Sequence, residues 1–98
     1  MTLGNKIKEL RIKKGILQRE LASKLHISEG YLSKIENDQK PLKRKDLRII
    51  SIYLSVDIIE LETLWLARKV CYVLKDEKQA LHALQAAEIE VKYKSKKK

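Results

Sequence analysis

The residue types that most often carry catalysis or bind metals are few in this chain and lie far apart. Its two histidines are His26 and His82, and its single cysteine is Cys71. A zinc site needs several such ligands at close spacing, and a nucleophile or general base needs a partner within hydrogen-bond reach. No carboxylate pair or glycine-rich phosphate loop is visible either. We therefore expect no enzyme activity, no metal and no cofactor, and we expect Cys71 to be a small core residue.

Basic side chains are the more abundant chemistry, and they are unevenly distributed. The chain has 22 Lys+Arg against 13 Asp+Glu, a net charge of +9. Residues 1–56 carry +7, residues 57–92 carry −2, and residues 93–98 carry +4. An excess positive field favours a polyanionic partner, and the N-terminal part is the one expected to meet it.

Length and composition limit the fold that can present these charges. Ninety-eight residues, 44% of them hydrophobic, suffice for one domain with an appendage, and only 3 Gly and 1 Pro favour helices. A lone cysteine and the lack of an apolar leader or membrane-length apolar window predict a cytoplasmic protein.

Apolar residues recur at helical spacing along the whole chain. The first stripe is expected to end at Gly15, and the next helix runs from Gln18 to Leu25. Ser28 is a good N-cap for a third helix over residues 28–37, and a fourth is expected over residues 43–54. Asp57 and Asp76 can each cap a further helix. The segment 49–56 alone could pass for a strand, but no second strand exists to pair with it, so we predict an all-α fold.

The segment from Leu17 to Asn37 resembles the helix-turn-helix of the Xre/Cro-like phage-repressor family. Gln-x-x-Leu-Ala at residues 18–22, a small-residue turn, and a Leu-x-x-Ile-Glu-Asn pattern at 32–37 occur in order and at the family's spacing. With its flanks the resemblance covers roughly residues 3–62. It implies a five-helix repressor-like domain with a C-terminal helical dimerisation extension.

The resemblance also assigns roles to individual residues. A buried ion pair between Arg11 and Glu36 is implied. The residues implied to contact base edges are Ser28, Glu29, Gly30, Ser33 and Lys34. Those implied to contact the DNA backbone are Gln18, Tyr31, Asn37, Lys40, Lys43 and Arg44. Two departures weaken the local structure: His26 stands where the family commonly has Gly, and Leu17 where it has a capping Ser or Thr.

Several of these side chains have a purely structural interpretation as well. Glu29 can accept from cytosine N4, but a carboxylate also favours a helix N-terminus without DNA. Gly30 allows close backbone approach to a base, or is simply tolerated near a helix end. Tyr31 can reach a phosphate or lie against the core. The basic run at residues 43–45 can be a solvated surface as easily as a phosphate contact.

The C-terminal third suggests assembly. We divide the chain into a DNA-binding domain at 1–62, a helical dimerisation extension at 63–92 and a disordered lysine-rich tail at 93–98. The consecutive apolar residues from Leu64 to Ala67 point in all directions around the helix axis, so the helix must be buried on more than one side. The expected dimerisation residues are Leu64, Trp65, Leu81 and Leu84.

Two function classes follow. The first is a sequence-specific transcriptional regulator, a repressor or autoregulator, that binds a palindromic operator as a homodimer with the third helix in the major groove. The second is an antitoxin-like or adaptor protein that binds another protein, such as a toxin or polymerase, through residues 57–92. The small polar residues on the outer face of the third helix favour DNA over a protein partner.

Overall fold

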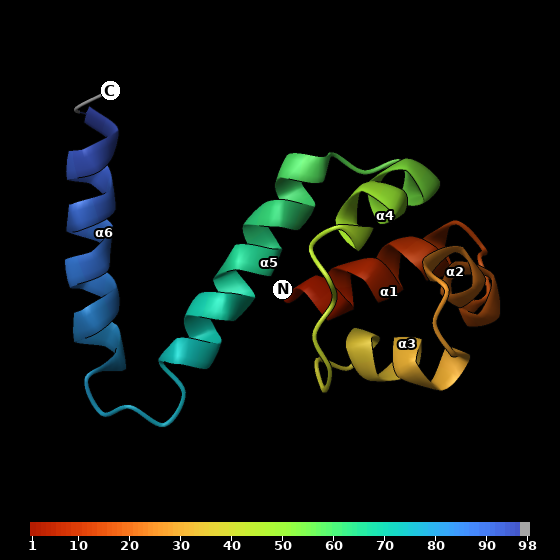
Figure 1. The fold of residues 1–98 in the computed structure, drawn as a ribbon, viewed down its shortest axis with the longest axis horizontal. Helices are drawn as coiled ribbons and strands as arrows, with labels where there is room; N and C mark the ends of the chain where they lie inside the picture. The colour runs from red at the N-terminus through yellow and green to blue at the C-terminus, as the bar shows by residue number, and fades with distance from the viewer. Residues whose placement is uncertain (97–98) are drawn as a thin grey trace.

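The computed structural model describes residues 1–96, which form six helices and no strand, and it confirms the all-α expectation (Figure 1). The helices are α1 (Leu3–Lys13), α2 (Gln18–Leu25), α3 (Glu29–Glu36), α4 (Asp46–Leu54), α5 (Ile58–Val73) and α6 (Ala80–Lys96). Helices α1 to α4 and the first half of α5 form one packed unit. Helix α6 stands apart from that unit, beyond the far end of α5 (Figure 1).

The core of the packed unit is made of the apolar stripes visible in the sequence. Every helix from α1 to α5 contributes a fully buried side chain, and these include Ile7, Leu21, Leu32, Ile50 and Leu61. Burying one such side chain stabilises the fold by about 1.5 to 3 kcal/mol. The stripes thereby fix which side of α3 faces inward and which is left for solvent.

Helices α1 to α4 all end in the same way, with one residue in the left-handed conformation. These residues are Gly15, His26, Asp38 and Ser55, with φ angles of 69°, 56°, 61° and 52°. In each case the following amide bonds to the carbonyl five residues before it, at 2.8 to 3.1 Å, which is the Schellman arrangement. The ending at Gly15 is confirmed, and so is the strained backbone at His26.

Helix starts follow the capping residues in the sequence. Ser28 and Asp57 accept hydrogen bonds from the first turns of α3 and α5, as expected, and Thr2 does the same for α1. Leu17 makes no side-chain cap for α2. Its amide instead donates to Glu20 Oε1 at 3.5 Å, which is the half of a capping box that a leucine permits.

Three expected boundaries are wrong. Helix α4 begins at Asp46, so residues 43–45 precede it in a turn rather than forming its first turn. Asp76 does not cap α6, because it has a left-handed φ of 61° in the turn and the helix starts at Ala80. Residues 93–96, expected to be disordered, continue α6, since nothing in that lysine-rich stretch breaks a helix. Residues 97 and 98 of the expected tail lie outside the described residues.

The first half of α5 belongs to the domain, whereas its second half is exposed. It packs on α1 and α4, with Leu61 buried and with Lys6 Nζ 2.7 Å from Glu60 Oε1. The hydrogen bond to Glu60 raises the pKa of Lys6 above its ordinary value. Cys71 is exposed, so the expectation that it is a core residue is wrong. No helix among residues 1–96 is both long enough and apolar enough to cross a membrane.

Candidate nucleic-acid interface

Helices α2 and α3 form the helix-turn-helix predicted from the sequence. Only three residues, His26 to Ser28, separate them, and the left-handed backbone at His26 makes the sharp turn. The apolar sides of both helices are buried, through residues such as Leu25 and Leu32. The opposite side of α3 therefore faces solvent along its length.

The predicted base-contact residues lie on this outer side of α3. Ser28, Glu29, Gly30 and Lys34 are exposed, and Ser33 is half-buried. Ser28 Oγ accepts a hydrogen bond from the backbone amide of Tyr31 at 3.0 Å, which fixes the start of the helix. These five residues thus form one small polar surface, in which Lys34 offers a donor and Glu29 an acceptor.

Gly30 is not required by the fold. A Cβ added at this position would meet nothing within 4 Å. Its backbone has no left-handed φ either, since Gly15 is the glycine with a positive φ among the described residues. The packing of the domain therefore offers no reason for a glycine here.

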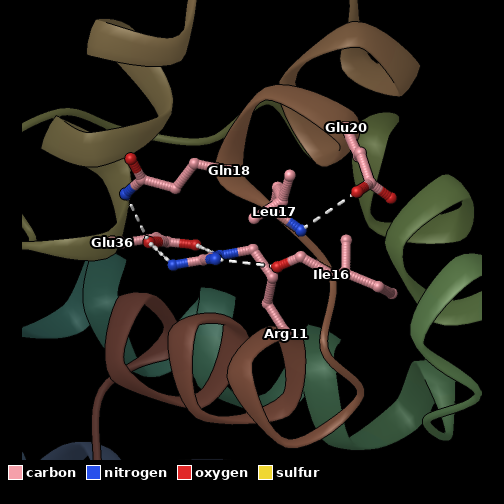
Figure 2. A network of polar contacts seen from close by, with 6 residues as sticks. All are labelled: Arg11, Ile16, Leu17, Gln18, Glu20 and Glu36. Carbon is pink, nitrogen blue, oxygen red and sulfur yellow. Dashed lines mark hydrogen bonds and ion pairs between the residues drawn. The ribbon is translucent and has the colours of Figure 1, made fainter.

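A buried ion pair holds α3 against α1, as the resemblance implied (Figure 2). Arg11 Nε and Nη2 donate to the two carboxylate oxygens of Glu36 at 2.7 and 3.1 Å, and Arg11 Nη1 donates to Ile16 O at 2.9 Å. Glu36 is 1% exposed. A bidentate geometry with all charges hydrogen-bonded is the one in which a buried pair can exist without a large penalty.

Gln18 joins this network from the start of α2. Its Nε2 donates to Glu36 Oε1 at 2.9 Å, so the buried carboxylate holds the amide group in one orientation (Figure 2). The side chain is half-buried. Sequence reasoning placed Gln18 at the DNA backbone but missed this hydrogen bond to Glu36.

The remaining predicted backbone-contact residues surround the loop between α3 and α4. Asn37, Lys40, Lys43 and Arg44 are all exposed there. Tyr31 of α3 is exposed, and its hydroxyl donates to Pro41 O at 3.4 Å. The ring therefore lies against the loop rather than in the core. The lysines and the arginine give this edge of α3 a concentration of positive charge.

Side chains from outside the helix-turn-helix hold this loop through contacts that no sequence pattern predicts. Thr2 Oγ1 donates to Asp38 Oδ2 at 2.7 Å, and Arg68 Nη2 donates to Asp38 O at 2.6 Å. Trp65 Nε1 donates to Leu42 O at 2.7 Å. None of these residues belongs to a motif, because each acts across a long separation in the sequence.

Gly4 permits a close approach of α1 to the end of α3. A Cβ at Gly4 would lie 2.4 Å from Ile35 O and 2.8 Å from Glu36 O, both of which are backbone atoms. Any larger residue would push the two helices apart. This glycine was not singled out in the sequence, where it resembles an ordinary first-turn residue.

The four predicted dimerisation residues fall into two groups. Leu64 and Trp65 are partly buried against the core of their own domain. Leu81 and Leu84 lie on α6, which has no buried residue, and they are 75% and 44% exposed. Leu84 also lines a groove of about 340 Å³ between α5 and α6, together with Lys69, Val70, Val73, Leu74, Ala83 and Ala87.

Comparisons with known proteins agree with this geometry. A family model described as helix-turn-helix matches residues 7–61, more than half of the chain. A propionyl-CoA carboxylase regulator of Cereibacter sphaeroides is 33% identical over 60 residues, which is 61% of this chain and 13% of that protein. The chain thus spans about an eighth of the length of this relative. No solved structure matches.

Proposed function

We propose that this chain, which belongs to the Xre/Cro-like helix-turn-helix family, binds a palindromic operator as a homodimer and represses or autoregulates transcription. The family binds DNA, and the matched relative is named a regulator, so a DNA-binding transcriptional regulator is the coarser conclusion. The observation that carries the finer proposal is the small polar outer face of α3, flanked by an exposed basic loop. No catalytic group takes part.

The exposed side chains suggest two roles, base contact and phosphate contact. Base edges would be read from the major groove by Ser28, Glu29, Gly30, Ser33 and Lys34. The duplex would be positioned through its phosphates by Gln18, Tyr31, Asn37, Lys40, Lys43 and Arg44. Phosphate contacts set affinity and orientation, whereas base contacts set sequence preference.

Gln18 supports this division because its orientation is fixed before DNA binds. Glu36 accepts one amide hydrogen, and the amide still has a second hydrogen available for a phosphate oxygen. A donor held by a buried carboxylate loses little rotamer freedom on binding.

The proposed dimer interface is α6 with the exposed half of α5. Helix α6 has no buried residue and displays large apolar side chains on several sides, including Ile89 and Val91. Most helices in proteins are stabilised by tertiary packing, so a second copy of the same surface is the simplest partner for these apolar side chains. A two-fold dimer would present two copies of α3 to half-sites about 34 Å apart.

Selection of bound fragments from a random DNA pool tests the proposal directly. We expect enrichment of a palindrome, with affinity falling about 10³ to 10⁵-fold between about 50 and 200 mM salt. Lys34→Ala should change the preferred base at one position in each half-site, by about 1 to 3 kcal/mol. Lys75→Ala, in the turn between α5 and α6, removes the same charge far from α3 and should leave base preference unchanged.

The exposed groove between α5 and α6 supports a second candidate, an adaptor that binds another protein there. The two candidates predict different outcomes in the same experiment. If the pool yields no enriched sequence while the protein is folded, the operator proposal fails and the adaptor is favoured. Sedimentation as a monomer at micromolar concentration would remove the homodimer from the proposal.

A further inference from the structure

Two hydrogen bonds tie α5 to the loop between α3 and α4, and both end on backbone carbonyls. Arg68 Nη2 donates to Asp38 O at 2.6 Å, and Trp65 Nε1 donates to Leu42 O at 2.7 Å. The two acceptors lie on either side of Lys40. The loop is therefore held at two points by a helix outside the helix-turn-helix.

Trp65 also contacts a basic residue of the same loop, Arg44. The guanidinium of Arg44 lies 5.1 Å from the centre of the indole ring, and Arg44 Nη2 is 3.6 Å from Glu62 Oε2. A cation over an aromatic face is attracted to it, and the nearby carboxylate adds to this restraint. One turn of α5 thus orients a side chain that we place at the DNA backbone.

Two further bonds hold the start of the loop, one from the N-cap residue of α1 and one to the last turn of α3. Thr2 Oγ1 donates to Asp38 Oδ2 at 2.7 Å, and the amide of Gln39 donates to Lys34 O at 2.8 Å. The hydrogen bonds that α5 itself donates to the loop backbone are those of the Trp65 indole and the Arg68 guanidinium. Removing one of them should loosen the loop without opening the core, because Arg68 is exposed and Trp65 only partly buried.

We propose that Trp65 and Arg68 are positioning residues for DNA binding: they hold the α3–α4 loop so that Lys40, Lys43 and Arg44 are presented to the phosphates. This inference rests on the proposed function. Its physical basis is preorganisation, since a loop that is already ordered loses less conformational entropy when it binds.

The decisive variant is Trp65→Phe, which keeps an aromatic ring beside Arg44 but removes the hydrogen-bond donor. The change is uncharged, so it cannot alter salt dependence by removing a direct phosphate contact. We expect operator affinity to fall about 3- to 10-fold, the net effect typical of one lost hydrogen bond. The slope of log affinity against log salt should become shallower by about one for each subunit. Base preference should not change.

Amide hydrogen exchange without DNA provides an independent measurement. The Gln39 amide should exchange several-fold faster in Trp65→Phe and in Arg68→Gln than in the parent protein. Lys75→Gln is the matched control for Arg68→Gln, because it removes one positive charge near the end of α5 without touching the loop. Exchange at Gln39 should be unchanged in that control.

The outcomes separate this inference from the proposed function. If the parent protein binds an operator but folded, dimeric Trp65→Phe keeps its affinity and salt slope, the positioning role is wrong and the operator proposal stands. If Trp65→Phe unfolds or loses its dimer, Arg68→Gln decides: faster exchange at Gln39 supports the role, and unchanged exchange refutes it. Absence of any operator refutes the proposed function, whereas the exchange measurement still tests the loop restraint.

Discussion

Replacing Glu36 by alanine should destabilise the domain more than any surface change. The substitution removes the acceptor of three hydrogen bonds, from Arg11 Nε, Arg11 Nη2 and Gln18 Nε2. It leaves Arg11, which is 8% exposed, as a buried charge without a carboxylate partner. Breaking a buried pair in this way typically costs about 3 to 5 kcal/mol.

This cost is comparable with the whole stability of the domain. At about 0.05 to 0.15 kcal/mol per residue, a unit of roughly 60 residues has about 3 to 9 kcal/mol. Glu36→Ala should therefore bring the domain close to its unfolding midpoint in water. Urea titration followed by the fluorescence of Trp65 measures this, because the chain has one tryptophan and its indole bonds to Leu42 O in the folded state.

The double variant Arg11→Met with Glu36→Leu tests the cause. Removing both charges replaces the pair by apolar side chains of similar size, which is often neutral for stability. We expect the double variant to be more stable than Glu36→Ala and than Arg11→Met alone. If the stability losses of Arg11→Met and Glu36→Leu, measured singly, simply add up in the double variant, the account of the buried pair is refuted. A loss below about 1 kcal/mol for Glu36→Ala would refute it as well.

The double variant also separates stability from DNA binding. Without the carboxylate, the Gln18 amide loses the acceptor that orients it. Operator affinity should then remain reduced even though the fold is restored. Full affinity in the double variant would show that the orientation of Gln18 does not matter.

Three single substitutions test the backbone and capping arguments. Gly30→Ala should raise stability by up to about 1 kcal/mol, because the added methyl meets nothing, and a simultaneous loss of operator affinity would identify close backbone approach to DNA. Gly4→Ala should lower stability by about 1 to 3 kcal/mol in urea titration, through the clash with Ile35 O, and an unchanged midpoint would contradict that packing. His26→Gly should raise the melting temperature by relieving a φ of 56°, a gain of up to about 1 kcal/mol, and a fall would mean that the strain is absent.

The sequence predicted the parts of this fold that depend on local pattern. Apolar spacing located the buried faces, and Ser28 and Asp57 marked helix starts. The family motif implied the ion pair between Arg11 and Glu36, which the structure contains. Such features can be predicted from residues close together in the sequence, or from a motif whose spacing implies one contact.

Contacts between distant segments could not be read in the same way. The bond from Trp65 to Leu42 O depends on where α5 crosses the loop, and the close packing of Gly4 depends on where α3 ends. Helix α4 starts later than predicted, because the apolar spacing marks its buried face but not its first residue, and residues 43–45 form a turn instead. The apolar neighbours of Cys71 predict a core position. This part of α5 extends beyond the packed unit, however, and the side chain is exposed.

Helix α5 connects the loop beside α3 to the groove shared with α6. Its first half packs on α1 and α4 and, through Trp65 and Arg68, restrains the loop beside α3. Its last turns carry the apolar residues of the groove shared with α6. A 16-residue helix is about 24 Å long and bends little, so a second copy bound at the groove would be held in a fixed relation to the loop. The spacing of the two α3 helices on an operator would then be set by helix length and packing rather than by a flexible linker, which predicts little tolerance for changes in half-site spacing.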